Sequence, residues 1–306
     1  MRLPDGVLGM AARGPDWAAW VDALPGIVRD LYAEWGLRPD GWMMHGYTAL
    51  VVPVVTEAGR PAMLKVAFPD VESEHEHLAL SHWAGRGAVR LLRAAPGRRA
   101  MLLEALRDEN LVDSWDVEAC EAVAELYSVL HIPAFNQLRL LSDVVSASAD
   151  RMAALPRSAP LPRRLVEQAV SLIRDFVADP ATTGTLIHGD LHYRNVLLDE
   201  DGDWRAIDPK PLNGDPHYEV AAMLWNRFEE LSSPYSRLSV RDGIRRRFHT
   251  LVDGAGLDEE RARDWTVVRM VQLAVQRLLD PAEQHRGPSE EHWLTMCVTV
   301  AKAVQD

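Results

Sequence analysis

His188-Gly189-Asp190-Leu191-His192-Tyr193-Arg194-Asn195 is followed by a short hairpin and then by Ile207-Asp208-Pro209. Residues 196–198 and 204–207 are predicted to be its strands, because apolar residues fill them and a glycine lies in the loop between them. A hairpin brings its open ends together, with opposed Cα atoms about 5 Å apart. We therefore expect Asn195 and Asp208 to lie side by side, with Asp190 on the loop that enters the same end.

The residue types at this end are those that phosphoryl transfer requires. Amide and carboxylate oxygens suit Mg²⁺, so Asn195 and Asp208 are predicted to hold this ion against the phosphates of ATP. Asp190 is predicted to orient the acceptor hydroxyl and to receive its proton. An Asp five residues before an Asn, with a second Asp after a hairpin, matches the spacing in protein kinases. A surface loop with a polar turn is the alternative, and it does not explain the complete set.

Lysine is scarce in this chain and identifies the candidate phosphate-binding cation. Of the 33 basic residues, only Lys65, Lys210 and Lys302 are lysines. Lys302 is close to the C-terminus and Lys210 follows Asp208, so only Lys65 lies on a predicted strand of the first part of the chain. Lys65 is therefore predicted to bind the phosphates of ATP.

The helix predicted after this strand should supply a carboxylate partner for Lys65. Glu72, Glu74 and Glu76 all remain candidates. Glu76 is favoured because Leu80 follows one helical turn later and can pack while Glu76 faces Lys65.

A turn that covers the phosphates is the least clear part of the pattern. The chain has no G-x-G-x-x-G after a strand and no G-x-x-x-x-G-K-[ST] motif. The turn Gly46-Tyr47-Thr48 comes directly before the strand predicted at residues 49–55. Gly46 and Thr48 can offer backbone N–H groups and a hydroxyl to phosphate. An ordinary β-turn explains the same residues equally well.

The order of predicted elements indicates an α+β protein with two lobes. In residues 1–105 we expect an antiparallel sheet with one inserted helix: a helix at 16–36, strands at 49–55 and 61–67, a helix at 70–84, and strands at 89–94 and 99–106. In residues 106–306 we expect mostly helices, at 117–132, 138–155, 161–178, 217–231, 237–252, 259–279 and 288–304. A β island at 185–187, together with the hairpin, interrupts these helices.

Composition excludes several classes of protein. The net charge of −12 argues against a nucleic-acid partner and suits a cationic small molecule. No apolar run approaches the ~18 residues of a membrane span, and the N-terminus has no secretory signal. Two distant cysteines, Cys120 and Cys297, provide neither a disulfide framework nor a zinc site. We expect a cytoplasmic monomer without membrane or nucleic-acid partners.

Other clusters of polar residues are expected to be structural. His75, His77 and His82 belong to a solvated helix face rather than a metal site, because His75 and His77 point to different sides of a helix. His188 and His192 flank Asp190 and are expected to support its loop. A run of aspartates in the hairpin loop lacks the glycine position and the final glutamate of a calcium-binding loop, which excludes that function.

These motifs resemble the aminoglycoside phosphotransferase family, which has the protein-kinase-like fold, and specifically its streptomycin 6-phosphotransferase and hydroxyurea phosphotransferase branch. The likeness rests on the Asp190 motif and on Ala206-Ile-Asp208-Pro-Lys-Pro-Leu-Asn-Gly214-Asp215-Pro216. It implies a bilobal fold, with a nucleotide-binding lobe at 1–105 and a helical catalytic and acceptor lobe at 106–306. The resemblance further implies that the backbone of Glu104 to Leu106 holds adenine and that Asp215 stabilises the catalytic lobe.

The resemblance implies ATP-dependent O-phosphorylation of a small antibiotic, with a streptomycin-type aminoglycoside as the expected acceptor. Hydroxyurea or another small metabolite on the same scaffold is the alternative. A nucleotide-binding pseudokinase is disfavoured because Lys65, Asp190, Asn195 and Asp208 are all present. The carboxylates available to contact a cationic acceptor are better interpreted as solvated helix charges; they are Glu219, Glu229, Glu230, Asp280 and Glu283.

Overall fold

The computed structural model describes residues 2–232, 238–280 and 288–305, and the chain divides into two compact units. Unit 1 comprises Met1–Asp108 and Leu198–Arg205, and unit 2 comprises Glu109–Leu197 and Ala206–Asp306. The tip of the hairpin after Asn195 therefore groups with unit 1, although it lies in the second half of the sequence. Within the described residues, no helix is both long enough and apolar enough to cross a membrane.

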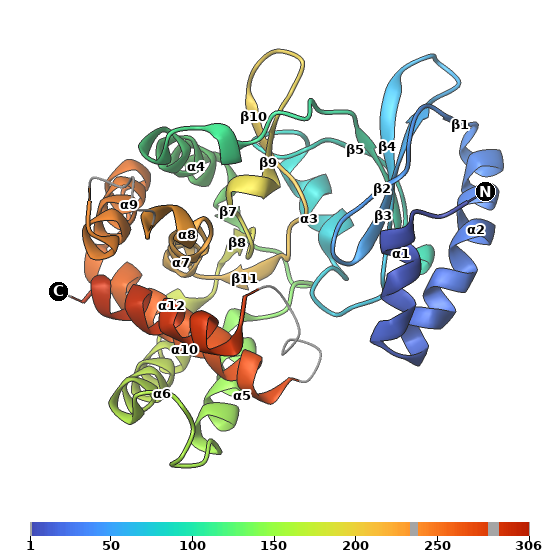
Figure 1. The fold of residues 1–306 in the computed structure, drawn as a ribbon. Helices are drawn as coiled ribbons and strands as arrows, with labels where there is room; N and C mark the ends of the chain where they lie inside the picture. The colour runs from blue at the N-terminus through green and yellow to red at the C-terminus, as the bar shows by residue number, and fades with distance from the viewer. Residues whose placement is uncertain (1, 233–237, 281–287, 306) are drawn as a thin grey trace. The chain divides into compact units, whose positions relative to one another are not determined.

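Unit 1 is built on an antiparallel sheet of six strands (Figure 1). These are β1 (Arg38–Pro39), β2 (Met44–His45), β3 (Ala49–Val55), β4 (Pro61–Ala67), β5 (Leu91–Ala95) and β6 (Ala100–Glu104). They lie in the order β1-β3-β4-β6-β5, and β2 pairs with β3. The four strands expected from the sequence are confirmed as β3 to β6, whereas β1 and β2 are too short to leave an alternating pattern.

Side chains of β4 alternate between the two faces of the sheet. Leu64 and Val66 are fully buried in the core formed with α2 (Pro15–Trp35). Lys65 points to the opposite face and bonds to a residue of α3 (Glu76–Trp83). Figure 1 shows α2 and α3 on opposite sides of the sheet. The alternation explains how a lysine in a buried strand reaches α3 instead of entering the core.

Two short helices precede α2 and belong to the same core. They are α1 (Asp5–Gly9) and the 3₁₀ helix η1 (Met10–Arg13). Val7 and Met10 are 0% and 2% exposed, and both pack within the cluster that α2 forms with the sheet. Residues 3–10 are therefore anchored by buried apolar contacts.

The helix predicted at residues 70–84 is shorter than expected. It begins only at Glu76, because the side chain of Asp70 bonds to the backbone of the preceding segment. Asp70 Oδ1 accepts hydrogen bonds from the N–H groups of Glu72 and Ser73, both at 2.8 Å. Such a side-chain bond offers the backbone an alternative to the first helical turn.

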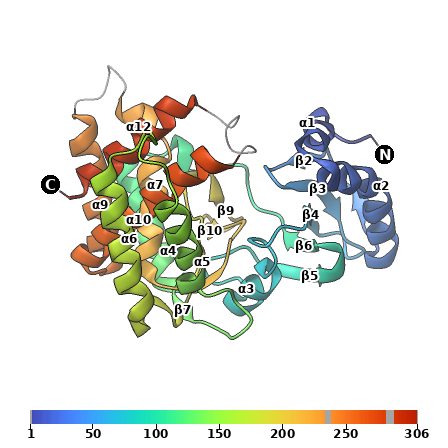
Figure 2. The same ribbon diagram turned by 90° about the horizontal axis from the view of Figure 1, so that it is seen from below.

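Unit 2 is mainly helical, as expected. Its α-helices are α4 (Asp116–Leu130), α5 (Leu141–Ala153), α6 (Arg163–Ala178), α7 (Val220–Trp225), α8 (Phe228–Leu231), α9 (Val240–Ala255), α10 (Glu259–Leu279) and α12 (Glu290–Ala303). The 3₁₀ helices are η3 (Leu111–Asp113), η4 (Pro180–Thr182), η5 (Tyr193–Asn195) and η6 (Pro216–Glu219). Figure 2 shows the longer of these helices, among them α4, α9, α10 and α12, from a second side. Arg237, the predicted start of one helix, lies outside the described residues, and α9 begins at Val240.

Two small sheets interrupt the helices in the second part of the chain, and the first of them spans the division between the units. One is the predicted hairpin, β9 (Val196–Leu198) with β10 (Trp204–Ala206). The other joins β8 (Thr185–Ile187) to β7 (Ile132–Pro133) and β11 (Leu212–Gly214). The α+β class and the β island are thus confirmed. β11 comes from a segment expected to be coil, and β7 begins at Ile132, the last residue of the helix predicted at 117–132. Strands of two or three residues carry little local signal.

The helix predicted at residues 217–231 is broken into η6, α7 and α8. The break falls at Arg227, whose φ of 57° is left-handed and ends the helical path. Buried Arg247 of α9 donates to the carbonyl oxygens of Asn226 and Arg227, at 2.7 and 3.3 Å. Arg247 therefore satisfies backbone groups that have no helical partner at the break.

Candidate active site

The open end of the β9–β10 hairpin places Asn195 beside Asp208. The N–H of Ile207 donates to the carbonyl oxygen of Asn195 at 2.9 Å, so the residues at the two strand ends are direct neighbours. The side-chain Nδ2 of Asn195 donates to the carbonyl oxygen of Asp190 at 2.8 Å. This bond ties Asn195 to the Asp190 loop and turns Oδ1 of Asn195 away from that carbonyl. The three residues predicted to act together are therefore brought together.

Asp208 has an unusual backbone conformation. Its φ is 56°, in the left-handed region that residues other than glycine seldom adopt. Such conformations persist where the surrounding structure over-determines them, and they concentrate at functional sites. Lys210 Nζ lies 3.8 Å from Asp208 Oδ1, so a lysine to which the sequence assigned no role lies beside this carboxylate.

His188 braces the loop of Asp190 against the segment before Asp208. Its Nε2–H donates to the carbonyl oxygen of Ile207 at 3.0 Å, and its Nδ1 accepts from the N–H of Asp190 at 3.3 Å. Accepting at Nδ1 requires the neutral ring. Burial lowers the pKa of His188 to about 4, which agrees with a neutral imidazole. The expected supporting role of His188 is confirmed.

The buried neutral His188 predicts how stability depends on pH. Its folded-state pKa of about 4 lies below the ordinary 6.5, so between these values the unfolded chain binds a proton that the folded chain does not. The contribution of His188 to the free energy of unfolding is fully present above about pH 6.5. It should fall by about 3 kcal/mol as the pH is lowered toward 4. Urea unfolding between pH 7 and pH 4.5 measures the slope. His188→Asn should flatten it, and an unchanged slope would contradict the assignment.

Gly189 is held from both sides by buried charged side chains. Glu219 Oε1 accepts from the N–H of Gly189 at 2.7 Å. Arg269 of α10 donates to the carbonyl oxygen of Gly189 at 2.5 Å and to that of Tyr218 at 3.1 Å. Glu219 and Arg269 are 0% and 6% exposed. Because both peptide groups of Gly189 are fixed, the backbone entering Asp190 is fixed as well.

Glycine is required at position 189. Its φ is 81°, and a Cβ atom placed there would lie 2.3 Å from the carbonyl oxygen of Lys210. The neighbouring group is backbone, so it cannot move aside as a flexible side chain would. The close approach lets the Asp190 loop pass directly against the Asp208 segment, where the N–H of Lys210 donates to the carbonyl oxygen of His188 at 2.8 Å.

The expectation that Glu219 is a solvated helix charge is wrong. Its carboxylate bonds to His131 Nε2 at 2.8 Å in addition to Gly189. Burial by itself would raise the pKa of Glu219, but the bonds from His131 and Gly189 and the nearby His188 hold it below its ordinary value. Glu230 pairs with Arg227 at 2.5 Å, and Glu283 lies outside the described residues.

A third anchor holds the middle of the loop. Tyr193 donates to Asp116 Oδ1 at 3.0 Å, and the same carboxylate accepts from Arg247 Nε. The guanidinium of Arg227 lies 4.7 Å from the centre of the Tyr193 ring. Asp116 and Arg247 are 131 residues apart, which explains why local patterns do not reveal this contact.

Asp215 joins several segments of unit 2 through its buried carboxylate. It is 1% exposed and accepts from Trp265 Nε1 at 2.7 Å and from Arg261 Nε at 2.5 Å. Burial would raise its pKa, but bonds from His217 and Trp265 and the charge of Arg261 lower it overall. These contacts agree with the stabilising role that the resemblance implies.

In unit 1, Lys65 pairs with Glu76. Lys65 Nζ lies 2.6 Å from Glu76 Oε1, and the two side chains are 8% and 1% exposed. Glu74 bonds instead to Arg99 at 3.3 Å. The structure therefore decides among the carboxylates that the sequence left open, and the partner is the favoured Glu76.

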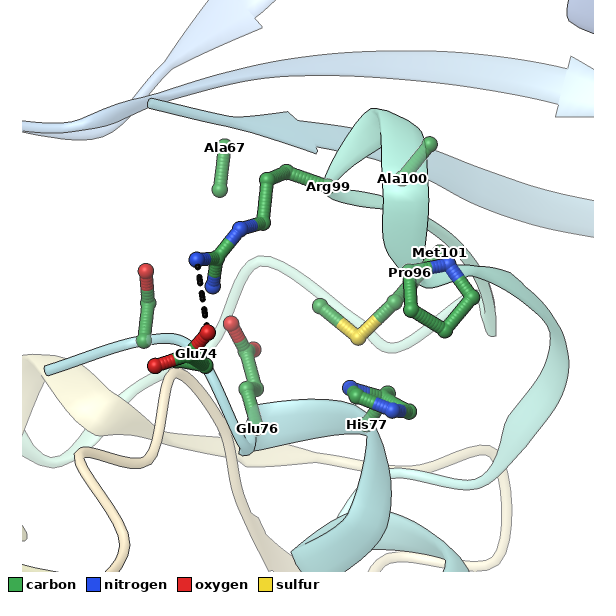
Figure 3. Close-up of a pocket in the computed structure, with 9 residues that line it drawn as sticks. Ala67, Glu74, Glu76, His77, Pro96, Arg99, Ala100 and Met101 are labelled. Carbon is green, nitrogen blue, oxygen red and sulfur yellow. Dashed lines mark hydrogen bonds and ion pairs between the residues drawn. The ribbon is translucent and has the colours of Figure 1, made fainter. Parts of the chain in front are cut away.

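A small pocket borders Glu76 on the side of β6 (Figure 3). Arg99 reaches across it from the end of η2 (Pro96–Arg98) to Glu74, while His77 and Met101 form another part of the wall. Burial and the charges of His75 and Arg99 lower the pKa of His77, so this side chain is a neutral wall residue. Among the described residues, no group of three His, Cys, Asp or Glu side chains could hold a metal ion.

The turn at residues 46–48 is the tip of the β2–β3 hairpin. The N–H of Gly46 donates to the carbonyl oxygen of Ala49 at 3.0 Å, which leaves Tyr47 and Thr48 as the two-residue loop. Val51 of the same strand pairs with Lys65. Thr48 is three residues before Val51, and three residues of strand span about 10 Å. The turn therefore lies about 10 Å along β3 from the residue that pairs with Lys65.

The segment after β6 is tied to its neighbours in unit 1 through both ends. Glu104 Oε1 accepts from the N–H of Arg90 at 2.7 Å, and the N–H of Arg107 donates to the carbonyl oxygen of Leu198 at 2.8 Å. The N–H of Leu106 donates to no backbone carbonyl within the described ranges. This geometry leaves the Leu106 amide available for the adenine contact that the resemblance implies.

Asn195 and Asp208 fit a magnesium ion. The bond from Asn195 Nδ2 to Asp190 leaves its oxygen as a ligand, and Asp208 supplies a carboxylate. Mg²⁺ typically uses one or two such protein oxygens and completes its octahedron with water and phosphate.

Comparisons with known proteins identify the family. The model of the aminoglycoside/hydroxyurea antibiotic resistance kinases matches residues 34–280. The chain is 34% identical over 295 residues to a streptomycin 6-kinase of Streptomyces glaucescens, covering 92% of this chain and 94% of that protein. It is 40% identical over 263 residues to a hydroxyurea phosphotransferase of Kitasatospora aureofaciens, covering 83% and 73%.

The fold agrees with this assignment. A thermostable variant of an aminoglycoside phosphotransferase, solved with ADP and hygromycin B, superposes with a TM-score of 0.61 at 18% identity, covering 90% of this chain and 97% of that one. The protein-kinase-like architecture expected from the Asp190 and Asp208 motifs is thus confirmed. The chain belongs to the aminoglycoside/hydroxyurea antibiotic resistance kinase family.

Proposed function

We propose that this protein transfers the γ-phosphoryl group of ATP to a hydroxyl of a small antibiotic, with a streptomycin-type aminoglycoside as the acceptor. The arrangement of Asp190, Asn195 and Asp208, held by the His188 brace, carries the proposal. Streptomycin 6-kinases covering most of the chain support the choice of acceptor, as does the net charge of −12. The 40% identity to a hydroxyurea phosphotransferase supports hydroxyurea as the second candidate.

Each candidate residue has a defined part in this reaction. Asp190 orients the acceptor hydroxyl and takes its proton as the oxygen attacks the γ-phosphorus. The bond from that phosphorus to the β–γ bridging oxygen breaks, and ADP leaves. Lys65, oriented by Glu76, holds the phosphates, while the 46–48 turn covers them and the backbone of Glu104 and Leu106 contacts adenine.

Asn195 and Asp208 would hold Mg²⁺, which neutralises the charge of the phosphates when it is bound. We expect the enzyme to act as a cytoplasmic monomer without nucleic-acid or membrane partners. Size-exclusion chromatography with light scattering tests the oligomeric state.

A screen of acceptors tests the proposed function. ADP formation is measured with streptomycin, with an aminoglycoside that lacks guanidinium groups, and with hydroxyurea, and mass spectrometry identifies the product. Streptomycin-dependent turnover that yields a monophosphorylated product is expected. Turnover with hydroxyurea alone would favour the second candidate, and turnover only with an unrelated metabolite would overturn the antibiotic assignment. ATP binding without turnover on any acceptor would favour a pseudokinase.

Asp208→Asn should weaken the dependence on Mg²⁺. An amide is a poorer ligand than a carboxylate, so the Mg²⁺ concentration for half-maximal rate should rise about tenfold or more. Titration of the rate with Mg²⁺ at saturating ATP measures this shift. Asp201→Asn, at the exposed hairpin tip, serves as the matched control and should behave as wild type. A wild-type Mg²⁺ dependence in Asp208→Asn would refute the ligand assignment.

A further inference from the structure

The N-terminal segment, residues 3–14, lies before the region matched by the family model and contacts the turn at residues 46–48. It is anchored in the core of unit 1 by Leu3, Val7 and Met10, which are 6%, 0% and 2% exposed. Because this segment is fixed in the core, a polar side chain on it can hold the 46–48 turn in a defined position.

Arg13 holds the turn directly. Its Nη1 donates to the carbonyl oxygen of Tyr47 at 2.6 Å, and its guanidinium lies 3.9 Å from the centre of the Tyr47 ring. The same guanidinium lies 4.7 Å from the ring centre of Trp17 in α2. Arg13 is thus sandwiched between a ring of the turn and a ring of the helix that follows it.

An aromatic stack continues this contact into the core. Trp17 stacks on Phe68 with ring centres 3.7 Å apart and an interplanar angle of 3°. The N–H of Phe68 donates to the carbonyl oxygen of Thr48 at 2.7 Å. The carbonyl groups of Tyr47 and Thr48 thus accept hydrogen bonds from Arg13 and Phe68. Both of these residues pack against Trp17.

Gly6 of α1 makes a second contact, with the residue that directly precedes the turn. A Cβ atom at Gly6 would lie 2.1 Å from Nε2 of His45, so a larger residue at position 6 would push this ring out of its place. His45 directly precedes the turn, and its Nδ1 donates to the carbonyl oxygen of Gly46 at 3.0 Å. The N-terminal segment thus touches the turn before and within its tip.

These contacts determine which way the backbone of the turn presents its donors. The C=O and N–H of a trans peptide point in opposite directions. Because Arg13 binds the carbonyl of Tyr47, the N–H of Thr48 in the same peptide points away from Arg13. No backbone carbonyl in the described part of the chain accepts from the Thr48 N–H. This amide and the Thr48 hydroxyl are suited to an anionic oxygen.

We propose that Arg13 and Gly6 are positioning residues for nucleotide binding, and that the N-terminal segment holds the 46–48 turn so that Thr48 faces the phosphates of ATP. This inference rests on the proposed function, because it requires ATP to be the ligand. It extends the nucleotide site to residues outside the region that the family model matches.

Affinity for Mg·ATP, measured by calorimetry on the full chain, tests the inference with four variants. Arg13→Ala loses a hydrogen bond from a charged group and should raise the dissociation constant about tenfold or more. Arg13→Lys keeps the charge and one donor but loses the planar stack, so an intermediate value is expected. Gly6→Ala should displace His45 and weaken binding. Gly9→Ala is the matched control in the same helix, since nothing lies within 4 Å of its Cβ position.

The rate constant separates positioning from general damage. At saturating ATP and acceptor, kcat of Arg13→Ala should stay within about twofold of wild type. The melting temperature should fall by only a few degrees, because Arg13 is exposed and lies outside the core. Wild-type ATP affinity in Arg13→Ala and Gly6→Ala, or equal loss in Gly9→Ala, would overturn the inference. Failure of the wild-type chain to bind ATP would instead overturn the proposed function.

Discussion

Asp190→Asn should lower kcat about 10²- to 10⁴-fold while the affinity for ATP stays close to that of wild type. Asparagine has nearly the same shape as aspartate but cannot accept the hydroxyl proton. The loop should keep its conformation, because the bonds that fix it reach the backbone of residue 190. Asn195 Nδ2 donates to its carbonyl oxygen, and its N–H donates to His188 Nδ1.

His192 does not replace the lost carboxylate in this variant. Its Nε2 lies 3.9 Å from Asp190 Oδ1, but burial and the neighbouring His188 lower its pKa to about 4. The ring is therefore neutral at about pH 7 and too weak a base to take up the hydroxyl proton. Single-turnover kinetics and ATP calorimetry measure chemistry and binding separately. If Asp190→Asn kept a tenth or more of the wild-type kcat, Asp190 would not be the base. Loss of ATP binding would show that its role is structural.

Arg269→Met should both destabilise the protein and slow the reaction. Two buried carbonyl oxygens, those of Gly189 and Tyr218, would lose their bonds to a charged donor, which costs about 3 to 5 kcal/mol in the free energy of unfolding. The peptide entering Asp190 would lose one of its two restraints, so kcat of the folded enzyme should fall about tenfold or more, since small misplacements are costly. Urea unfolding and kcat measured where the variant is fully folded give the two quantities.

Arg277→Met is the matched control on the same helix. Arg277 is 4% exposed and donates to the carbonyl oxygen of Pro288 at 2.5 Å, but no described contact links it to the Asp190 loop. It should lose stability without losing kcat. Arg269→Lys keeps the charge and should recover part of the rate. Equal losses of kcat in Arg269→Met and Arg277→Met would show that Arg269 acts on stability alone.

Most of the catalytic loop could be predicted from the sequence because its geometry is local. Asn195 and Asp208 are separated by one hairpin, and the hairpin by itself forces their ends together. Lys65 could be proposed as the phosphate-binding lysine because the chain has only three lysines, and Lys65 alone lies on a predicted strand of the first part of the chain. The resemblance then implied an adenine contact for Glu104 and Leu106 and a stabilising role for Asp215.

The residues that hold the backbone of this loop could not be predicted from the sequence, because they come from distant parts of the chain. Arg269 and Gly189 are 80 residues apart, and Glu219 and Gly189 are 30 apart. A weak signal does exist for Arg269: it is a single charge among Val267, Val268, Met270 and Val271, where a solvated helix face would carry more polar residues. Glu219 similarly precedes a run of apolar residues.

The sequence by itself determined the α+β class, the hairpin and the identity of the residues proposed for chemistry, because periodicity, turn residues and short spacings act within a few residues. Only the tertiary structure decided that Glu76 rather than Glu74 meets Lys65, that Asp70 delays the start of α3, and that Glu219 is buried instead of solvated. These outcomes depend on which surfaces meet when distant segments pack. A charged side chain that becomes buried needs a hydrogen-bonding or oppositely charged partner in the packed structure. The local sequence does not show which residue that partner is.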